Sequence, residues 1–243
     1  MSKLLILGGT TEARLLCDAV ANKGLDATVS LAGATSNPAR LAVPFRIGGF
    51  GGAAGLTNWM SNQRINAMID ATHPFARQMP WNGVEACRRA CVKRLRLLRP
   101  RFQGPCVSDR VDTLTEALNM LPMRTRVLVT TGRKQTEVFE SRPDLIIYLR
   151  TIEPVANLPS HVISLEQRPP FSLEDELALL RKHRIDTLIS KDSGGVTAPK
   201  LMAAQTLELK TILLTRPNQP PGPTVQTVDQ AVAWLHDVVG FGN

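Results

Sequence analysis

Short runs of apolar residues alternate with amphipathic stretches along the chain. The first run, residues 4–7, is followed by Gly8-Gly9. Apolar residues then recur at the spacing of about 3.6 that is typical of a helix, at Ala13, Leu16, Cys17 and Val20. The opening stretch therefore predicts a strand, a tight glycine turn and a helix.

The alternation continues into the middle of the chain. Strands are predicted over residues 27–31, 43–47, 67–72 and 95–98, and helices over residues 56–61 and 77–92. The strand at residues 67–72 is largely apolar, which favours a parallel strand buried on both faces. Residues 99–105 have the Pro, Gly and Arg composition of a crossover between domains.

The second half repeats the pattern. Strands are predicted over residues 126–131, 145–149, 161–165, 187–190 and 211–215, and helices over residues 112–121, 199–207 and 228–239, with one more opened by the N-cap Ser172. We therefore predict two similar α/β halves with mainly parallel sheets.

Composition narrows the class of protein. The chain has 243 residues, 43% hydrophobic and 21% charged, which is ordinary for a globular protein of one large or two small domains. No stretch approaches the ~20 apolar residues of a membrane span, and the first apolar run is too short for a secretory signal, so we expect a cytoplasmic protein with no membrane partner. We interpret Cys17, Cys87, Cys91 and Cys106 as buried free thiols, and we expect no metal site.

The formal net charge of +8 favours a polyanionic partner, which leaves nucleic acid, phosphate groups or a small polycarboxylate. The densest basic run is interpreted as the solvated face of a helix and its exit, and it consists of Arg88, Arg89, Lys93, Arg94, Arg96, Arg99 and Arg101. No aromatic residue lies within it, which argues against single-stranded nucleic acid as the partner.

A glycine turn between a strand and a helix is typical of nucleotide binding, because it brings the backbone and the helix N-terminus close to a diphosphate. The full G-x-G-x-x-G is absent, so a turn without a ligand is the alternative. NAD-binding folds usually carry an acidic residue after the second strand, whereas residues 32–37 contain none. This favours NADP, with Thr35, Ser36 and Arg40 nearest to a 2′-phosphate, although a plain loop accounts equally well for each.

Two further segments lie at predicted strand ends. Residues 48–52 include four glycines, which indicates either a flexible connection or a backbone that approaches a ligand. His73 follows the strand at residues 67–72, where α/β sheets bind ligands, although a histidine that anchors a turn before proline is the alternative.

Six motifs in order resemble those of the precorrin-6A reductases of cobalamin biosynthesis. They are GGTTEAR at 8–14, IGGFGG at 47–52, DATHPFA at 70–76, TGR at 131–133, KDSGG at 191–195 and APKLMAA at 198–204. The resemblance extends over nearly the whole chain. It implies two Rossmann-like domains, residues 1–100 for NADPH and residues 101–243 for substrate, with the macrocycle in an interdomain cleft.

The implied reaction is the NADPH-dependent reduction of one ring double bond of precorrin-6A to give precorrin-6B. The resemblance places the cofactor diphosphate and ribose on Gly8, Gly9, Thr10, Thr11 and Glu12, and the nicotinamide beside residues 70–75, among them Asp70, Ala71 and Thr72. Relatives often carry arginine where this chain has Ala34, which leaves Ser36 or Arg40 for the 2′-phosphate.

Precorrins carry a ring of carboxylates, which a cationic rim would attract. Candidate residues lie at or just after predicted strand ends, namely Arg133, Lys134, Lys191, Lys200 and Arg216, with Ser193 and Gly194 of the KDSGG motif. Singly, each cation is typical of a solvated surface. The reduction also needs a proton, for which His73, Lys191 and Asp192 are candidate donors and water is a competitor.

Three alternatives differ from this interpretation. A short-chain dehydrogenase needs a tyrosine four residues before a lysine, but the single tyrosine, Tyr148, is followed at that spacing by Ile152. A non-catalytic NADP-binding regulator would use the basic run on nucleic acid. The cobalt-containing substrate of the anaerobic route is the third alternative. The oligomeric state is open.

Overall fold

The computed structural model of the chain describes residues 3–32, 41–104, 107–195 and 198–240. The chain forms two compact units. The first consists of Met1–Pro100 and Pro217–Asn243, and the second of Arg101–Arg216. Each contains a six-stranded sheet in which all the described strand pairs are parallel.

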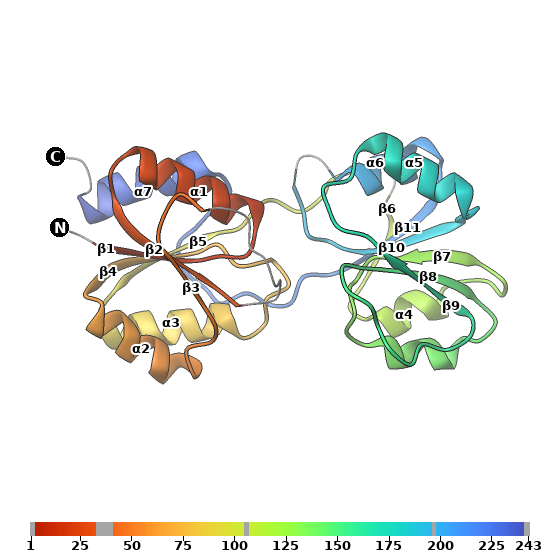
Figure 1. Ribbon diagram of the computed structural model, residues 1–243, viewed down its shortest axis with the longest axis horizontal. Coiled ribbons are helices and arrows are strands. Elements are labelled where there is room, and N and C mark those ends of the chain that lie inside the picture. The colour runs from red at the N-terminus through yellow and green to blue at the C-terminus, as the bar shows by residue number, and fades with distance from the viewer. Residues whose placement is uncertain (1–2, 33–40, 105–106, 196–197, 241–243) are drawn as a thin grey trace. The chain divides into compact units, whose positions relative to one another are not determined.

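The first unit has strands in the order β12-β5-β4-β1-β2-β3. Helices α1 and α7 cover one face of its sheet, and α2 and α3 cover the other (Figure 1). Its elements are β1 (Lys3–Leu7), α1 (Thr11–Asn22), β2 (Asp26–Leu31), β3 (Phe45–Ile47), α2 (Gly52–Asn62), β4 (Ile65–Asp70), α3 (Met79–Ala90), β5 (Lys93–Leu97), β12 (Thr224–Val225) and α7 (Val228–Val239).

The apolar run of β1 is explained by this layered arrangement. Successive side chains of a strand point to opposite faces of the sheet. Leu4 and Ile6 therefore join the core beneath α1 and α7, while Leu5 and Leu7 join the core beneath α2 and α3. Because both faces are buried, residues 4–7 of the strand are all apolar, and only Lys3 at its start is polar.

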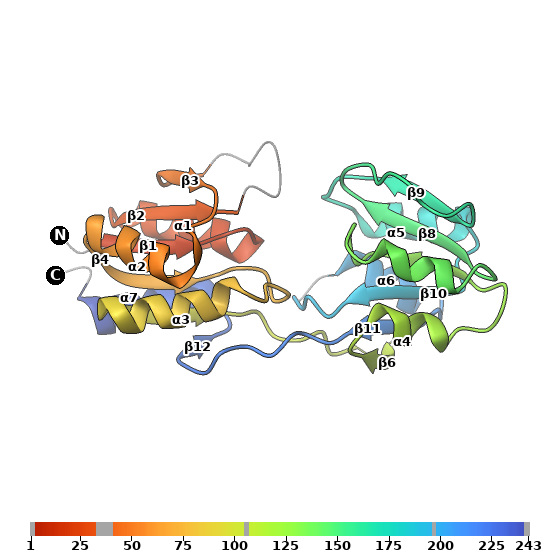
Figure 2. The same cartoon turned by 90° about the horizontal axis from the view of Figure 1, so that it is seen from below.

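The second unit has the order β6-β11-β10-β7-β8-β9. Helices α5 and α6 lie on one face of its sheet and α4 on the other (Figures 1 and 2). Its elements are β6 (Val107–Val111), α4 (Leu114–Asn119), β7 (Arg126–Val129), the 3₁₀ helix η1 (Thr136–Ser141), β8 (Ile146–Thr151), β9 (Val162–Glu166), α5 (Leu173–Lys182), β10 (Thr187–Lys191), α6 (Pro199–Thr206) and β11 (Lys210–Leu214).

The outermost strand beside β5 corrects the expected extent of the second domain. We expected residues 101–243 to form it, but residues 217–243 belong to the first unit. There β12 pairs with β5, and Ala231 and Leu235 of α7 are buried in the core beside α1. In the second unit the corresponding outer position is taken by β6, which precedes β7 in the chain. The amphipathic pattern of a helix indicates that one of its faces packs against a sheet, but it does not indicate which sheet.

The pattern of apolar positions located most other elements within a few residues. It missed three short ones, β6, β12 and η1. Strand β6 reads VSDRV and is nowhere fully buried, so it lacks the apolar run that marks the central strands. Strand β12 has two residues and no detectable period.

The three cysteines among the described residues are free, but they are not all buried. Burial raises the pKa of Cys17 to about 11 and that of Cys87 to about 12, so both are inert thiols. The prediction was wrong for Cys91, which is exposed, and Cys106 lies outside the described residues. Among the residues described, no group of His, Cys, Asp and Glu is arranged to hold a metal, and no helix is long and apolar enough to cross a membrane.

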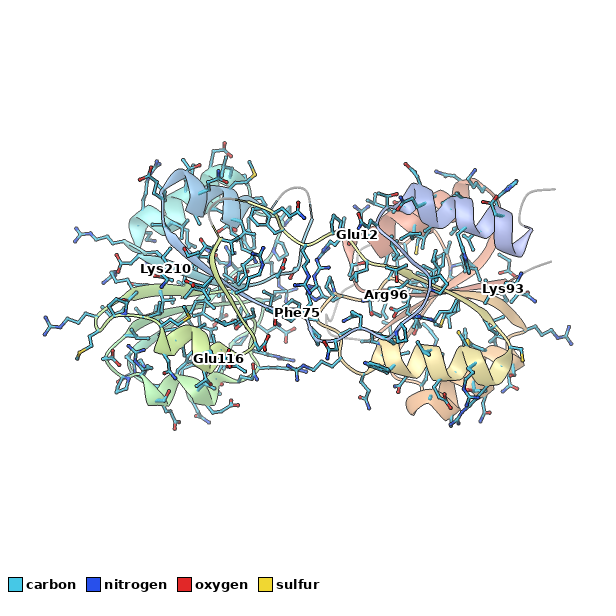
Figure 3. All side chains as sticks on the ribbon, turned by 180° about the vertical axis from the view of Figure 1, so that it is seen from behind. Glu12, Phe75, Lys93, Arg96, Glu116 and Lys210 are labelled. Carbon is cyan, nitrogen blue, oxygen red and sulfur yellow. The ribbon has the colours of Figure 1, made fainter. Side chains whose placement is uncertain are left out.

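The basic run does not form one solvated face. Arg88 and Arg89 are exposed and pair with Glu85 on α3. Arg96, by contrast, is buried, and Figure 3 shows it inside the first unit, away from Lys93 at the other end of β5. The interpretation as a helix face and its exit therefore holds for α3 and is wrong for Arg96.

Candidate active site

The glycine turn after β1 is shaped by two different requirements. Gly9 has a φ of +117°, which L side chains rarely adopt, and the space where its Cβ would lie is open. Gly8 has an ordinary φ, but a Cβ there would meet Cγ2 of Val29 at 2.8 Å. Its N–H donates to Ser30 O at 2.9 Å. Gly8 thus lets β1 and β2 pack closely, and Gly9 turns the chain and leaves room beside the backbone.

Thr10 ends the turn and begins α1. Its Oγ1 accepts a hydrogen bond from Ala13 N at 3.1 Å and donates one to Ala71 O at 2.8 Å. The first bond caps the helix, and the second ties the turn to the end of β4. The remaining first-turn N–H groups of a helix have no acceptor within the helix, so they are available to an anion.

Two cavities of about 420 and 300 Å³ open at this turn, and both are lined by Gly9 and His73. The first extends along α1 and is also lined by Arg14, Leu41 and Arg99. The second extends under the loop after β3. Their position at the carboxyl ends of parallel strands is where α/β sheets bind nucleotides.

Arg46 on β3 organises the second cavity. Its Nη1 donates to Ser30 Oγ and to Gly48 O, both at 2.8 Å, and its Nη2 donates to Gly49 O at 3.0 Å. Its guanidinium carbon lies 4.0 Å from the centroid of the Phe50 ring. The glycine-rich segment is therefore held in place with its backbone beside a cavity, which supports the second of the two interpretations of residues 48–52.

A buried ion pair stands at the end of β4. Asp70 is 0% exposed and Arg96 is 2% exposed, and the two occupy paired positions on neighbouring strands. Arg96 Nη1 lies 2.6 Å from Asp70 Oδ1 and also donates to Asp70 O and Thr72 Oγ1. Burial lowers the pKa of Arg96 below its ordinary value, and the Asp70 carboxylate opposes that effect.

The segment after β4 turns sharply at His73. Phe75 N donates to His73 Nδ1 at 3.1 Å, and Ala76 N donates to His73 O at 2.7 Å. Because Nδ1 accepts a hydrogen bond, the neutral ring carries its proton on Nε2. The histidine thus anchors a turn and lines both cavities, so the two interpretations of this residue are compatible.

The remaining expected cofactor residues either have a protein partner already or lie outside the described residues. Glu12 pairs with Arg99 at 2.8 Å, which ties the start of α1 to the chain after β5. Figure 3 shows Glu12 and Phe75 toward the same end of the first unit. Ala34, Thr35, Ser36 and Arg40 lie outside the described residues. Sequence reasoning did not single out Arg46, Phe50 and Arg99 as parts of the site. Phe50 stands within the glycine-rich run and Arg99 within the basic run, and nothing local shows that Arg46 reaches Ser30 or that Arg99 reaches Glu12.

In the second unit, the candidate proton donor Lys191 ends β10, and the candidate Asp192 directly follows it. Asp192 is 0% exposed, and its Oδ1 accepts from Phe102 N at 3.0 Å. Its Oδ2 lies 3.7 Å from Nε of Arg110, and its backbone O accepts from Arg216 Nε at 2.8 Å. These contacts give Asp192 an anchoring role, and they give Arg216 a structural contact in addition to its charge.

The other candidate cations gather at the carboxyl ends of β7, β10 and β11, which are neighbours in the sheet. Lys200, in the first turn of α6, donates to Thr130 Oγ1 at 3.3 Å. Arg133 is exposed and pairs with Glu153 at 3.1 Å, and Lys134 is exposed. Ser193 and Gly194 follow Asp192 in the same segment. These candidate residues lie at one end of this sheet, and both of the arginines among them already have protein partners.

Taken together, a glycine turn, a helix N-terminus and two cavities at the carboxyl ends of a parallel sheet define a Rossmann-like nucleotide-binding protein with two α/β units. The family profile of the precorrin-6x reductases, CbiJ/CobK, matches residues 3–236. The chain belongs to this family of oxidoreductases of cobalamin biosynthesis, which use a nicotinamide cofactor. The resemblance inferred from the six motifs and the predicted fold class are both confirmed.

Individual relatives cover almost the full chain. The chain is 40% identical to a precorrin-6A reductase of Rhodococcus erythropolis over 97% of its own length and 98% of the relative's. It is 27% identical to a cobalt-precorrin-6A reductase of Priestia megaterium over 94% of its own length and 96% of the relative's. A solved structure of CobK precorrin-6A reductase superposes with a TM-score of 0.91 at 36% identity, over 98% of this chain and 97% of the other.

We expect Asp70→Ala to lower the free energy of unfolding by about 3–5 kcal/mol, because it leaves a buried guanidinium without its carboxylate. Urea denaturation measures this, with Asp237→Ala on the exposed surface of α7 as the control. The double variant Asp70→Leu/Arg96→Met should recover most of the loss, since no charge then remains buried. An Asp70→Ala protein as stable as the control would contradict this account of the pair.

Proposed function

We propose that this chain reduces one ring double bond of precorrin-6A to give precorrin-6B, with NADPH as the reductant. The observation that carries the proposal is the sequence identity of 36–40% to precorrin-6A reductases over 95–98% of the chain. Cobalt-precorrin-6A reductases match at 27–31% identity, over 67–94% of the chain. The metal-free substrate is therefore favoured over the cobalt-containing one.

The residues at the glycine turn fit a dinucleotide. Gly9 leaves space at the backbone, the first turn of α1 offers N–H groups to a diphosphate, and the two cavities extend to either side. We assign Gly8, Gly9, Thr11 and Glu12 to this part of the cofactor site. Thr10 holds the turn to Ala71 and so supports the site through its geometry.

NADPH is favoured over NADH by the end of β2. Ser30 and Leu31 there, with Ala32 after them, carry no carboxylate to bind the 2′-hydroxyl and repel a 2′-phosphate. We assign the 2′-phosphate to Ser36 or Arg40 in the following segment. Asp70, Ala71 and Thr72 would lie on the nicotinamide side, at the end of β4.

When bound, the cofactor supplies a hydride to one carbon of the double bond. The neighbouring carbon needs a proton, and we assign its delivery to His73, which lines both cavities. The donor is the imidazolium form of the ring, which takes its proton from solvent and, after the transfer, returns to the neutral ring whose Nδ1 accepts from Phe75 N. Lys191 and Asp192 are the alternative donors, of which Asp192 is already bound to Phe102 N. The cations of the second unit, Arg133, Lys134, Lys191, Lys200 and Arg216, together with Ser193 and Gly194, are assigned to the carboxylates of the macrocycle.

The direct test is incubation with precorrin-6A and NADPH, following the nicotinamide absorbance and the absorption of the ring. We expect NADPH to be oxidised in proportion to the ring reduced, and NADH to be used more slowly. Cobalt-precorrin-6A, offered in parallel, should turn over more slowly than the metal-free ring. If NADPH is oxidised with neither ring, the assignment is wrong.

The variant Gly9→Asp tests the cofactor site. A side chain at this φ is strained, and its charge would repel a diphosphate, so we expect the affinity for NADPH to fall at least about a hundredfold. Gly24→Asp is the matched control, because it adds the same group in open space at the far end of α1. Titration calorimetry measures both. Equal affinities in the two variants would place the diphosphate elsewhere.

The variant His73→Gln tests the proton donor. We expect kcat to fall by about 10²–10⁴-fold while the affinity for NADPH changes little, because the loss falls on the chemical step. His236→Gln, on the exposed surface of α7, is the control. A His73→Gln enzyme with full turnover would exclude His73, and Lys191→Gln would then distinguish a second side chain from water.

A further inference from the structure

We propose that Gln219 is a positioning residue for the turn at residues 73–76, and that it sets the place of His73 in the active site from a segment far away in the chain. The proposal rests on the function proposed above. It concerns a residue between β11 and β12, in the segment that enters the first unit after Arg216.

Both polar atoms of the Gln219 side-chain amide form hydrogen bonds. Its Nε2 donates to Pro74 O at 3.1 Å and to Pro217 O at 3.0 Å. Its Oε1 accepts from Arg96 Nη2 at 3.3 Å. Only this orientation of the amide satisfies all three contacts, since a carbonyl can only accept and a guanidinium can only donate.

The contact to Pro74 fixes the position of the turn, which the turn's own hydrogen bonds do not. The two hydrogen bonds from Phe75 N and Ala76 N to His73 fix the internal shape of the turn. They do not fix where the turn lies against the sheet. Thr10 binds the preceding Ala71, and Gln219 binds Pro74, so His73 is held from both sides.

Arg96 connects this contact to the core. Its Nη1 holds Asp70 and Thr72, and its Nη2 holds Gln219. One buried guanidinium therefore joins the end of β4 to Gln219, which lies 123 residues after Arg96 in the chain. A rigid supporting shell of this kind is what keeps a reactive group within a fraction of an ångström of its working position.

The location of the contacts predicts which kinetic constant changes. Gln219 does not line either cavity, and it touches neither the glycine turn nor α1 in the described contacts. Its loss should therefore leave the affinity for NADPH nearly unchanged. Displacement of His73 should slow the chemical step, because small errors in geometry are costly there.

The test compares Gln219→Glu with Gln226→Glu. The first variant keeps an acceptor for Arg96 but replaces the donor facing Pro74 O with a carboxylate oxygen. The second makes the same charge change at an exposed position directly after β12. We expect kcat with precorrin-6A to fall about tenfold or more in Gln219→Glu. The Kd for NADPH should stay within about twofold of the control, and the urea midpoint should stay within a few tenths molar of it. Gln219→Met, which lacks both amide functions, should show the same separation of kcat from Kd.

Hydrogen exchange provides a readout that does not depend on turnover. The amides of Phe75 and Ala76 should exchange at least about tenfold faster in Gln219→Glu and Gln219→Met than in Gln226→Glu, while amides of β1 remain unchanged. Unchanged exchange at these two amides overturns the proposal even if the wild-type chain proves inactive on precorrin-6A. Faster exchange with unchanged kcat in an active enzyme also overturns it. Parallel losses of kcat, NADPH affinity and stability would reduce Gln219 to a structural anchor and overturn it as well.

Discussion

The buried guanidinium of Arg96 is the interaction on which the first unit's functional end depends. A charge removed from water is tolerated only when hydrogen bonds and an opposite charge replace its solvation. Here the replacement comes from three residues in two segments, Asp70 and Thr72 at the end of β4 and Gln219 before β12. The guanidinium that needs these partners therefore also connects the two segments. A hydrophobic residue at this position would pack as well but would leave these segments unconnected.

The same principle recurs in the second unit with different residues. Asp192 follows β10 as a buried carboxylate, and it is bound by Phe102 N while Arg110 lies close to it. Arg216 donates to its backbone carbonyl. In both units, then, a buried aspartate at the carboxyl end of a central strand organises the loops that a ligand would meet. In the first unit those loops surround the glycine turn, and in the second they carry the cations assigned to carboxylates.

The sequence was most informative where one short segment contains the whole signal. The run at residues 4–7, the glycines and the cap Thr10 predicted β1, the turn and α1, because strand period, backbone freedom and capping are local properties. The site contacts were harder to foresee, because they join distant positions. Arg99 meets Glu12, Arg46 meets Ser30, and Gln219 meets Pro74 only after the sheet has formed.

The same distinction explains the error in the extent of the second domain. The apolar period of residues 228–239 identified a helix correctly, yet nothing local shows that it packs beside α1. Strand β12 was invisible because two residues carry no period, although its pairing with Arg96 and Leu97 completes the first sheet. Short edge strands depend on the partner strand, and the partner cannot be inferred from the strand's own residues.

The late position of β12 and α7 in the chain has a consequence for how the protein folds during translation. The second unit is one continuous stretch, whereas the first is completed by residues that are synthesised after the whole of the second unit. During translation the sheet of the first unit would lack its outer strand, and the core around Leu95 and Leu97 would lack the cover of α7. Such an intermediate exposes apolar surface and an unpaired strand edge, the features that recruit chaperones. The order of folding would then be the reverse of the order of synthesis, with the second unit complete before the first.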